Sequence, residues 1–584
     1  MNPRSVPFFL VLAGCTGTMA ATDKDEATDG IYSETGDADT AETGNVDTVE
    51  TGDTGSVETG GETGTIETGD SGDTDRPEAS ELDVWPTAMT VNPGASYRLR
   101  VVTTARDGTE EEARGASFAS GDEFVATVDP TGVITAVAAG ATQIQVDASG
   151  LTEFVDITVQ DELAAYVTIV DGTTGLAIEG ATVRTAIGDF TTDATGLAVA
   201  TVADANAATL TAWINEDYHA VSLLETVGRS FTIPLAVLAD DTGTAELHGT
   251  VDFGAVPDSG FSELVVGVAC ATVQQAPAMF DLADLLAENR TVSVFGVDAD
   301  VPSNLFIETY AEDFSAPARS GPVATWGISG PIAIADVTAG LNDAGDALEL
   351  FIANLDHMVW GLNTGYVAVA GSTTEVSLAP SEDFTDTLSL ALPTLPLGFD
   401  GSEEQFVLTM DERVDEGFVV TGMGLGAGLA DVDRVTPGSV PASIQSVVYT
   451  YAQAGGVGSG LGTSVSVAEE GRGTVTFPDL LDLPAVNSWN AGTRELDVTT
   501  DGDAQLVRIS LIDDNGRVHD FYTDASWAGV VDKSMSEFER GQATVQVEAY
   551  AGLDGNLEHW FSTATFDPAG LSPDRRARER LVKE

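Results

Sequence analysis

The segment FASGDEFVATVDPTGVITA, residues 118–136, decides the fold class of this chain. Within it, the runs Val-Ala-Thr-Val-Asp at 125–129 and Gly-Val-Ile-Thr-Ala at 132–136 are rich in Val, Ile and Thr, which is typical of short strands. Similar short runs rich in Val, Thr, Ile, Leu and Phe, broken by Gly, Asp, Pro and Asn, continue to about residue 570. The sequence therefore predicts an all-β chain of several β-sandwiches in tandem, preceded by a disordered acidic linker.

Residues 81–160 form the first predicted domain. They begin with ELDVWPTAMTVNPGASYRLRVVTTARDG, which predicts two strands with turns at Pro93-Gly94 and Asp107-Gly108. Together with the Val-Ala-Thr-Val-Asp and Gly-Val-Ile-Thr-Ala runs, this order resembles the bacterial immunoglobulin-like group 2 domain. Phe118 stands where that family often has Trp, which keeps an aromatic residue in the core. The resemblance implies a β-sandwich that serves as a spacer or adhesive module.

Residues 163–236 form the second predicted domain. Its motifs are Asp-Gly-Thr-Thr-Gly from Asp171, Ile-Glu-Gly-Ala-Thr-Val from Ile178, and Thr-Asp-Ala-Thr-Gly from Thr192. This order resembles the carboxypeptidase regulatory-like family, although Asp217 replaces the usual Gly before Tyr218. The resemblance implies a non-catalytic, transthyretin-type β-sandwich of a kind found in surface and transport proteins. Asp171 and Asp193 are expected to cap turns through hydrogen bonds to the backbone.

Residues 237–584 resemble no known family. Recurrent strand patterns predict two β domains, at 240–392 and 393–570, followed by a charged tail at 571–584. Helical spacing of apolar residues occurs at Met279–Asn289, and Asp574–Glu584 is a second candidate helix. The arginine-rich tail either docks onto an anion such as the acidic linker, or is a frayed charged terminus.

The N-terminus has the layout of a signal peptide, residues 1–14. A single cation, Arg4, precedes an apolar run that ends in Leu12-Ala13-Gly14-Cys15 and is too short to span a membrane. These four residues resemble the lipobox of bacterial lipoproteins, which implies export, cleavage before Cys15 and acylation of its thiol. Thr16, rather than Asp, follows the cysteine, a pattern similar to that of outer-membrane sorting in two-membrane bacteria. The alternative is an ordinary signal peptide with an incidental cysteine.

Residues 15–80 are the predicted acidic linker. Glu-Thr-Gly recurs at Glu34, Glu42, Glu50, Glu58, Glu62 and Glu67, with little between the copies that could form a core. Such a composition favours a disordered, self-repelling stalk. Calcium binding is a weaker hypothesis because the acidic residues lack the Asp-x-Asp-x-Asp-Gly pattern.

The charge of the chain excludes several classes of partner. Lys and Arg number 24 against 94 Asp and Glu, for a net charge of −70. Phosphate backbones would be repelled, so we expect no nucleic-acid partner. Attraction of basic patches to anionic lipid is excluded on the same ground. The second cysteine, Cys270, lies in an apolar run, and we expect it to be a buried small hydrophobe.

Motifs that carry chemistry are scarce. None of the five histidines has metal-ligand spacing, and no Gly-x-Ser-x-Gly elbow occurs. Asp356-His357 near Trp360 could line a glycan groove, although a strand end is the simpler interpretation. His519 lies among aspartates, and Asp513-Asp514-Asn515-Gly516 predicts a hairpin turn. The glycine-rich stretches 422–428 and 455–462 are interpreted as loops or tight bends, because neither has a dinucleotide-binding pattern.

These observations favour a lipid-anchored protein of the cell envelope, at the outer membrane or cell surface. Its C-terminal β region would bind a polysaccharide or a surface protein, and the membrane would be reached through Cys15. We expect no enzyme activity, no cofactor, and no catalytic or metal-binding residues. Two alternatives remain: a surface hydrolase with an unrecognised C-terminal catalytic domain, and a passive structural subunit of an envelope complex.

Overall fold

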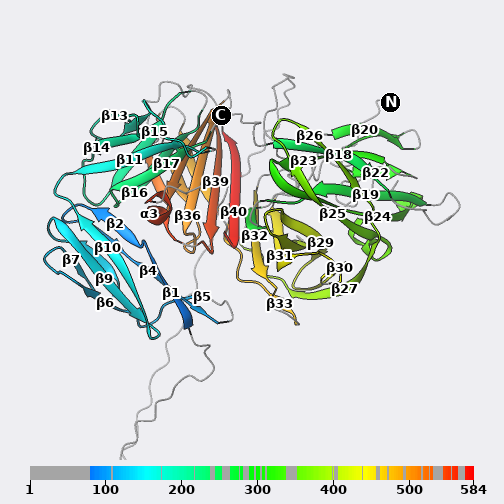
Figure 1. Cartoon of the computed structure of the whole chain (residues 1–584), viewed down its shortest axis with the longest axis horizontal. Coiled ribbons are helices and arrows are strands. Elements are labelled where there is room, and N and C mark those ends of the chain that lie inside the picture. The colour runs from blue at the N-terminus through cyan, green and yellow to red at the C-terminus, as the bar shows by residue number, and fades with distance from the viewer. Residues whose placement is uncertain are drawn as a thin grey trace, which may run out of the picture. The chain divides into compact units, whose positions relative to one another are not determined.

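The computed structural model describes residues 79–583, except for 107–109, 173, 216–217, 237–243, 253–262, 275–276, 280–288, 295–296, 303–304, 309–311, 337–350, 397–398, 400–404, 437, 455–460, 470–472, 491–492, 494, 514–516, 525, 531–542, 554 and 563–572. The predicted signal peptide, Cys15 and all but the last two residues of the predicted linker lie outside the described residues. Throughout the described chain, strands dominate and helices are short, which confirms the predicted all-β class (Figure 1).

The first domain is a β-sandwich whose strands follow the alternating pattern of its sequence. One sheet has the order β1 (Ala79–Trp85), β4 (Arg100–Ala105), β5 (Glu110–Glu112). A second has the order β2 (Ala88–Val91), β10 (Leu151–Val159), β9 (Gly140–Ala148), β6 (Ser117–Ser120). A third has the order β3 (Ser96–Arg98), β8 (Val133–Ala136), β7 (Ala126–Val128). Alternate apolar residues of these strands, among them Ile134, Ile144 and Val155, are buried together in one core.

The turn between β7 and β8 shows why residues 118–136 specify this fold. Asp129 Oδ1 accepts hydrogen bonds from the backbone N–H groups of Thr131, at 2.8 Å, and Val133, at 3.0 Å. Gly132 has a φ of +80°, and a Cβ placed there would lie 2.9 Å from the ring of Phe118. The glycine therefore supplies the left-handed turn and also leaves room for the aromatic residue that covers it.

The second domain contributes strands to two sheets. One sheet has the order β14 (Leu197–Thr201), β11 (Ala164–Asp171), β17 (Ser230–Leu235). The other begins with β12 (Thr182–Arg184), β13 (Asp189–Thr191), β15 (Ala208–Trp213) and β16 (Ala220–Thr226). Asp171 and Asp193 each accept a backbone N–H, from Thr174 at 2.7 Å and from Thr195 at 2.8 Å. Their predicted role in capping turns is confirmed.

The C-terminal region consists mainly of antiparallel strands. Its first part contains β18 (Thr244–Val251), β19 (Glu263–Ala271), β20 (Asn289–Val294), β21 (Val297–Pro302), β22 (Leu305–Glu308), β23 (Glu312–Arg319), β24 (Gly321–Ala333), β25 (Val359–Ala368), β26 (Thr373–Leu378) and β27 (Glu382–Ala391). The middle part contains β28 (Gln405–Arg413), β29 (Gly417–Gly426), β30 (Leu429–Val435), β31 (Ser443–Ala454), β32 (Leu461–Ala468) and β33 (Val475–Thr476). The last part contains β34 (Ala485–Asn490), β35 (Glu495–Thr499), β36 (Leu506–Asp513), β37 (Val518–Thr523), β38 (Trp527–Val530), β39 (Ala543–Ala551), α3 (Leu557–Ser562) and β40 (Arg575–Lys583). No helix in the described chain has the length and apolar character needed to cross a membrane.

One hydrophobic cluster contains residues from both sides of the predicted boundary near residue 393. Trp326 and Trp360 are buried in it together with Leu408 and Tyr449. The indole N–H of Trp360 donates a hydrogen bond to the carbonyl oxygen of Val420, at 2.8 Å. The division into domains at 240–392 and 393–570 stays a prediction.

Two local predictions are corrected by the structure, and a third lies mostly outside the described residues. In the candidate helix Met279–Asn289, Met279 ends a short 3-10 turn and Asn289 begins a strand, while residues 280–288 lie outside the described chain. The candidate helix Asp574–Glu584 is instead strand β40, which pairs with both β39 and β32. The glycine-rich stretch at 422–428 is largely part of β29, where a Cβ on Gly424 would lie 2.7 Å from Val432 of the adjacent strand. Glycine at this position permits close packing of two strands.

Candidate functional site

Strand β16 of the second domain pairs in parallel with β37 of the C-terminal region. Ala220 is opposite His519, Val221 is opposite Asp520, and Ser222 is opposite Phe521. The sheet continues from β37 through β36, β39 and β40 in antiparallel pairs. Successive side chains of a strand point to opposite faces, so the side chains of His519 and Asp520 lie on different faces of this sheet. Both faces carry buried polar groups, and these form our candidate site.

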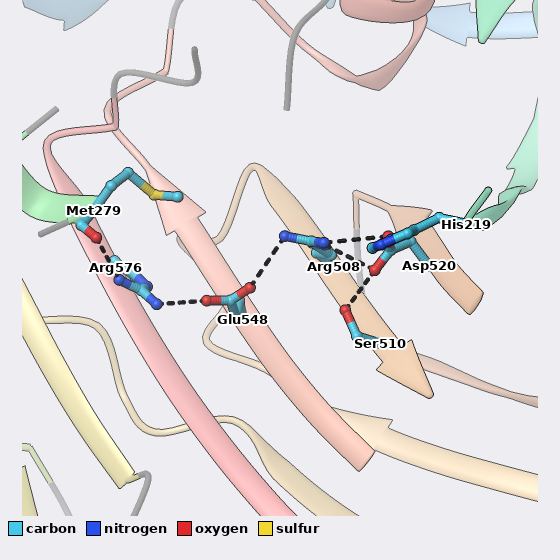
Figure 2. A network of polar contacts seen from close by, with 7 residues as sticks. All are labelled: His219, Met279, Arg508, Ser510, Asp520, Glu548 and Arg576. Carbon is cyan, nitrogen blue, oxygen red and sulfur yellow. Dashed lines mark hydrogen bonds and ion pairs between the residues drawn. The ribbon is translucent and has the colours of Figure 1, made fainter. Parts of the chain in front are cut away.

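Asp520 is the centre of the network on the first face. Its carboxylate lies 3.0 Å from His219 Nδ1 and accepts hydrogen bonds from Arg508 Nε at 2.9 Å and Ser510 Oγ at 2.5 Å (Figure 2). The residue is 3% exposed. His219 immediately precedes β16, whereas the other partners come from β36, so the carboxylate connects the second domain to the C-terminal region.

The network extends across the sheet to β40. Glu548 of β39 lies 3.7 Å from Arg508 and accepts a hydrogen bond from Arg576 Nη2 at 2.6 Å. Arg576 also donates a hydrogen bond to the backbone carbonyl of Met279 at 2.8 Å (Figure 2). Acidic and basic side chains thus alternate from one strand to the next, and each buried charge has an opposite charge beside it.

The alternation of charge holds both carboxylates in their ionised form. Burial by itself would raise the pKa of Asp520, but the charge of Arg508 and the contact with His219 outweigh it and hold that pKa well below its usual range. Burial likewise opposes ionisation of Glu548, yet Arg576 and Arg508 lower its pKa to about 2. The carboxylates of the network are therefore permanent anions at neutral pH.

The second face carries a serine–histidine pair. Ser222 Oγ lies 2.8 Å from His519 Nε2 and 2.7 Å from Thr211 Oγ1. The imidazole of His519 stacks on Phe521, with ring centroids 3.9 Å apart. Ser222 is 1% exposed and His519 is 2% exposed.

Ser222 and His519 have the distance of a nucleophile and its base but lack the access that catalysis needs. A nucleophile must reach a substrate atom, whereas Ser222 Oγ is covered within the sheet. Asp520, the next residue after His519, points to the other face and cannot orient its imidazole. The chemistry that this arrangement supports is hydrogen bonding between the two strands.

A second group of buried polar contacts joins all three regions of the chain. Arg229, immediately before the second domain's β17, is fully buried, and its Nε donates a hydrogen bond to Asn92 Oδ1 of the first domain at 2.8 Å. Glu558 of α3 accepts a hydrogen bond from the backbone N–H of Val227 at 2.7 Å. Nearby, Asn556 donates a hydrogen bond to the hydroxyl of Tyr97 at 2.6 Å.

Glu558 is a carboxyl group in an environment that disfavours its charge. Burial raises its pKa to about 7, even though hydrogen bonds from the backbone N–H groups of Gly228 and Val227 and the charge of Arg229 act in the opposite direction. A Cβ on Gly228 would lie 2.2 Å from Glu558 Oε2, so glycine is required there for the helix to approach. Glu558 therefore titrates near neutrality at the junction between regions.

Asp356, His357 and Trp360 do not form the glycan groove that was the alternative to a strand end. His357 lies at the end of a short 3-10 turn, and its side chain is 65% exposed beside Asp356 at 3.7 Å. Trp360 begins the buried part of β25 and is 1% exposed. The aromatic ring belongs to the core and the histidine to the surface, as expected from the simpler interpretation as a strand end.

The remaining predicted residues have structural positions or lie outside the described chain. Cys270 is buried and is not part of a disulfide. Residues 506–513 and 518–523 form a hairpin, as Asp513-Asp514-Asn515-Gly516 predicts, although residues 514–516 themselves are not described. Among the described residues, no group of three or more His, Cys, Asp or Glu could hold a metal ion. Cys15 and its predicted lipid lie outside the described chain.

The contacts of His219 and His519 are not predicted by the sequence, although His519 lies among aspartates. His219 and His519 have no spacing that would relate them, because their contacts depend on a pairing between distant strands. A usable signal was nevertheless present in LVRISLID and ATVQVEAYA, where single charged residues interrupt otherwise apolar strands. Such residues are rarely buried without an opposite charge.

Comparison with known proteins supports the assignment of the first domain. Residues 79–150 match the sequence profile of the bacterial Ig-like domain (group 2), which confirms that resemblance. Among curated proteins, none matches the chain. Domains 5–6 of the S-layer protein SbsC are similar at 12% identity, over 43% of this chain and 91% of that chain, with a TM-score of 0.15. A tetra-tandem repeat from the extending region of a large adhesion protein is similar at 12% identity, over 85% and 99%, with a TM-score of 0.12. Invasin, a bacterial integrin-binding protein, is similar at 10% identity, over 86% and 78%, with a TM-score of 0.11.

Proposed function

We propose that the chain is a lipid-anchored cell-surface protein without catalytic activity. Its tandem β domains hold the C-terminal β region away from the membrane, where it binds a polysaccharide or a surface protein. Export and acylation at Cys15 rest on the lipobox-like sequence, and the second domain is assigned to the carboxypeptidase regulatory-like family on its motifs. The proposed location is the outer membrane or the cell surface.

One observation carries the proposal: the second domain and the C-terminal region share one hydrogen-bonded sheet through β16 and β37. The polar residues that could have suggested chemistry there, Ser222, His519 and Asp520, are all buried in strand-to-strand contacts. Independent domains joined by flexible linkers would need no such contacts. Strand pairing limits the motion of the C-terminal region relative to the second domain, as we expect of a spacer that presents a distal surface.

The test uses the full chain, because a fragment beginning at residue 240 would lack β16 and would expose the edge of β37. Full-length Cys15→Ala protein is immobilised and challenged with envelope extract and a polysaccharide panel, with and without calcium. Each polysaccharide is also analysed for breakdown products. Saturable, competable binding without breakdown supports the proposal. Breakdown of any polymer overturns the non-catalytic part, and the absence of binding under every condition overturns adhesion.

The anchor is tested separately in a bacterial host with an alkyne-labelled fatty acid. We expect labelling of the wild-type chain and recovery with membranes, and loss of both in Cys15→Ala. Cys270→Ala is the matched control and should be labelled like the wild type, because Cys270 is 1% exposed. Equal labelling of Cys15→Ala would show that Cys15 is not the acylated residue.

A further inference from the structure

A groove in the first domain lies between two strand edges that have no partner strand in the described chain. It has a volume of about 350 Å³ and is lined by β1, from Ser80 to Trp85, and by the first residues of β10, Leu151 to Phe154. This volume is within the range of about 300–1,000 Å³ that is usual for ligand sites. The groove belongs neither to the polar network nor to the C-terminal region.

The edge of β10 is open because β2 covers only part of it. Strand β2 pairs with residues 156–159 of β10, whereas residues 151–155 pair only with β9 among the described strands. Asp156 and Gln160 donate their N–H groups toward β2, to Thr87 and Val91. Because backbone direction alternates along a strand, the N–H and C=O groups of Thr152 and Phe154 point to the same side, where no described strand follows.

The edge of β1 is open by the same reasoning. Strand β1 pairs with β4 alone among the described strands, and β4 pairs on its other side with β5. The carbonyl of Val101 accepts a hydrogen bond from Ala113 on the β5 side, so the backbone of Val102 points to β1 and to its partner Asp83. Alternation then directs the backbone N–H and C=O groups of Leu82 and Val84 away from β4.

The side chains of the groove define the charge of its occupant. Glu81, Asp83 and Glu153 line it, and no Lys or Arg does. Phe154, which is 51% exposed, adds an apolar surface at its rim. A second copy of the same edge would bring carboxylate against carboxylate, and so would the preceding residues 61–78, whose one cation is Arg76. Charge complementarity therefore selects a basic occupant.

We propose that this groove binds an extended basic segment of a partner protein by strand addition. The segment's main chain would hydrogen-bond to the open groups of Leu82 and Val84 or of Thr152 and Phe154. Its Lys or Arg side chains would lie beside Glu81 and Glu153. Main-chain pairing supplies affinity in this mode, and alternate side chains supply specificity. The inference is independent of the proposed function of the C-terminal region.

The experiment measures binding of labelled octapeptides to full-length Cys15→Ala protein by fluorescence anisotropy. The probe is an acetylated peptide of alternating Lys and Val, compared with its Glu–Val counterpart and with a Lys–Val peptide N-methylated at alternate residues. We expect saturable binding of the Lys–Val peptide, no binding of the Glu–Val peptide, and a loss of about tenfold or more on N-methylation. The N-methylated peptide has the same charge but cannot donate along one edge.

Variants of the protein identify the site. Glu81→Lys/Glu153→Lys should weaken binding of the Lys–Val peptide by about tenfold or more. Both residues are exposed, and the substitutions reverse the sign of the charge at the groove. The matched control is Glu123→Lys/Glu179→Lys, which makes the same charge change at exposed positions outside the groove and should bind like the wild type. Equal weakening by both variants, or equal binding of the N-methylated peptide, would show general attraction to an acidic protein and overturn the proposal. Absence of saturable binding would overturn it as well.

Discussion

His219 Nδ1 lies 3.0 Å from Asp520 Oδ2, although 301 positions separate the two residues in the sequence. This contact joins the second domain to the C-terminal region beside the parallel pairing of β16 and β37. On the opposite face of the same strands, Ser222 and His519 make a second contact of the same kind. The two regions are therefore joined by main-chain pairing and by polar side chains on both faces.

Removal of the Asp520 carboxylate should be strongly destabilising. Asp520→Ala removes the closest anion of Arg508, which is 25% exposed and keeps Glu548 at 3.7 Å, and it also removes the acceptor of Ser510. The loss of one partner of a buried ion pair costs about 3–5 kcal/mol, and we expect the lower end of that range. The control is Asp386→Ala, whose partner Arg434 keeps Glu469 and whose own side chain is 37% exposed. We expect a loss of at most about 1 kcal/mol there. Urea unfolding, followed by the fluorescence of the buried aromatic residues, checks both, and equal shifts of the midpoint would contradict this account.

Ser222 should behave as a structural hydroxyl group. A fluorophosphonate, which labels activated serine nucleophiles, should leave the native chain unlabelled at Ser222, because that oxygen is covered within the sheet. Ser222→Ala should still lower stability by about 1–3 kcal/mol, since it removes one hydrogen bond each from the side chains of Thr211 and His519. Mass spectrometry of the treated protein gives the result. Labelling at Ser222 would favour the hydrolase alternative.

The sequence predicts local strands and turns better than it predicts which distant strands pair. Residues 125–136 specify their strands and turn by neighbours in the chain, as Asp129 and Gly132 show. The partner of β37 is instead a strand about three hundred residues earlier, and no local periodicity encodes that choice. For the same reason no local signal relates the histidines at 219 and 519. The arginine-rich tail, which pairs with β39 and β32, likewise has a local sequence that predicts a helix or a frayed end.

Gly132 should be hard to replace by any other residue. Gly132→Ala places a Cβ at a φ of +80° and 2.9 Å from the ring of Phe118, so strain and a steric clash add. Gly150→Ala is the matched control, with a φ of +83° but nothing within 4 Å of its Cβ. We expect costs of about 2–4 kcal/mol for the first variant and about 1 kcal/mol for the second. Hydrogen exchange of residues 125–136, measured by mass spectrometry, distinguishes them, and equal protection in the two variants would contradict a role for Phe118.

The junction around Glu558 should make stability depend on pH near neutrality. Burial raises the pKa of Glu558 in the folded chain to about 7 from a model-peptide value of 4.5. A raised pKa means that the folded state holds the proton more tightly. The contribution of the protonated Glu558 to the free energy of unfolding is therefore fully present below the unfolded-state pKa and is lost as pH rises through about 7. The full difference corresponds to about 3 kcal/mol.

Glu558→Gln keeps an oxygen that can accept the N–H of Val227 but removes the titration. Between pH 5 and pH 8, the wild type should lose more stability than Glu558→Gln, by an amount that approaches about 3 kcal/mol. Asp520 and Glu548, whose pKa values are lowered, do not interfere because they titrate below that window. Urea midpoints at pH 5, 6, 7 and 8 for both proteins provide the measurement. If the midpoints of the two proteins change with pH in parallel, a group other than Glu558 causes the pH dependence. If they converge at low pH and separate at high pH, the titrating group is the carboxyl group of Glu558, which lies against the backbone of Val227 and Gly228.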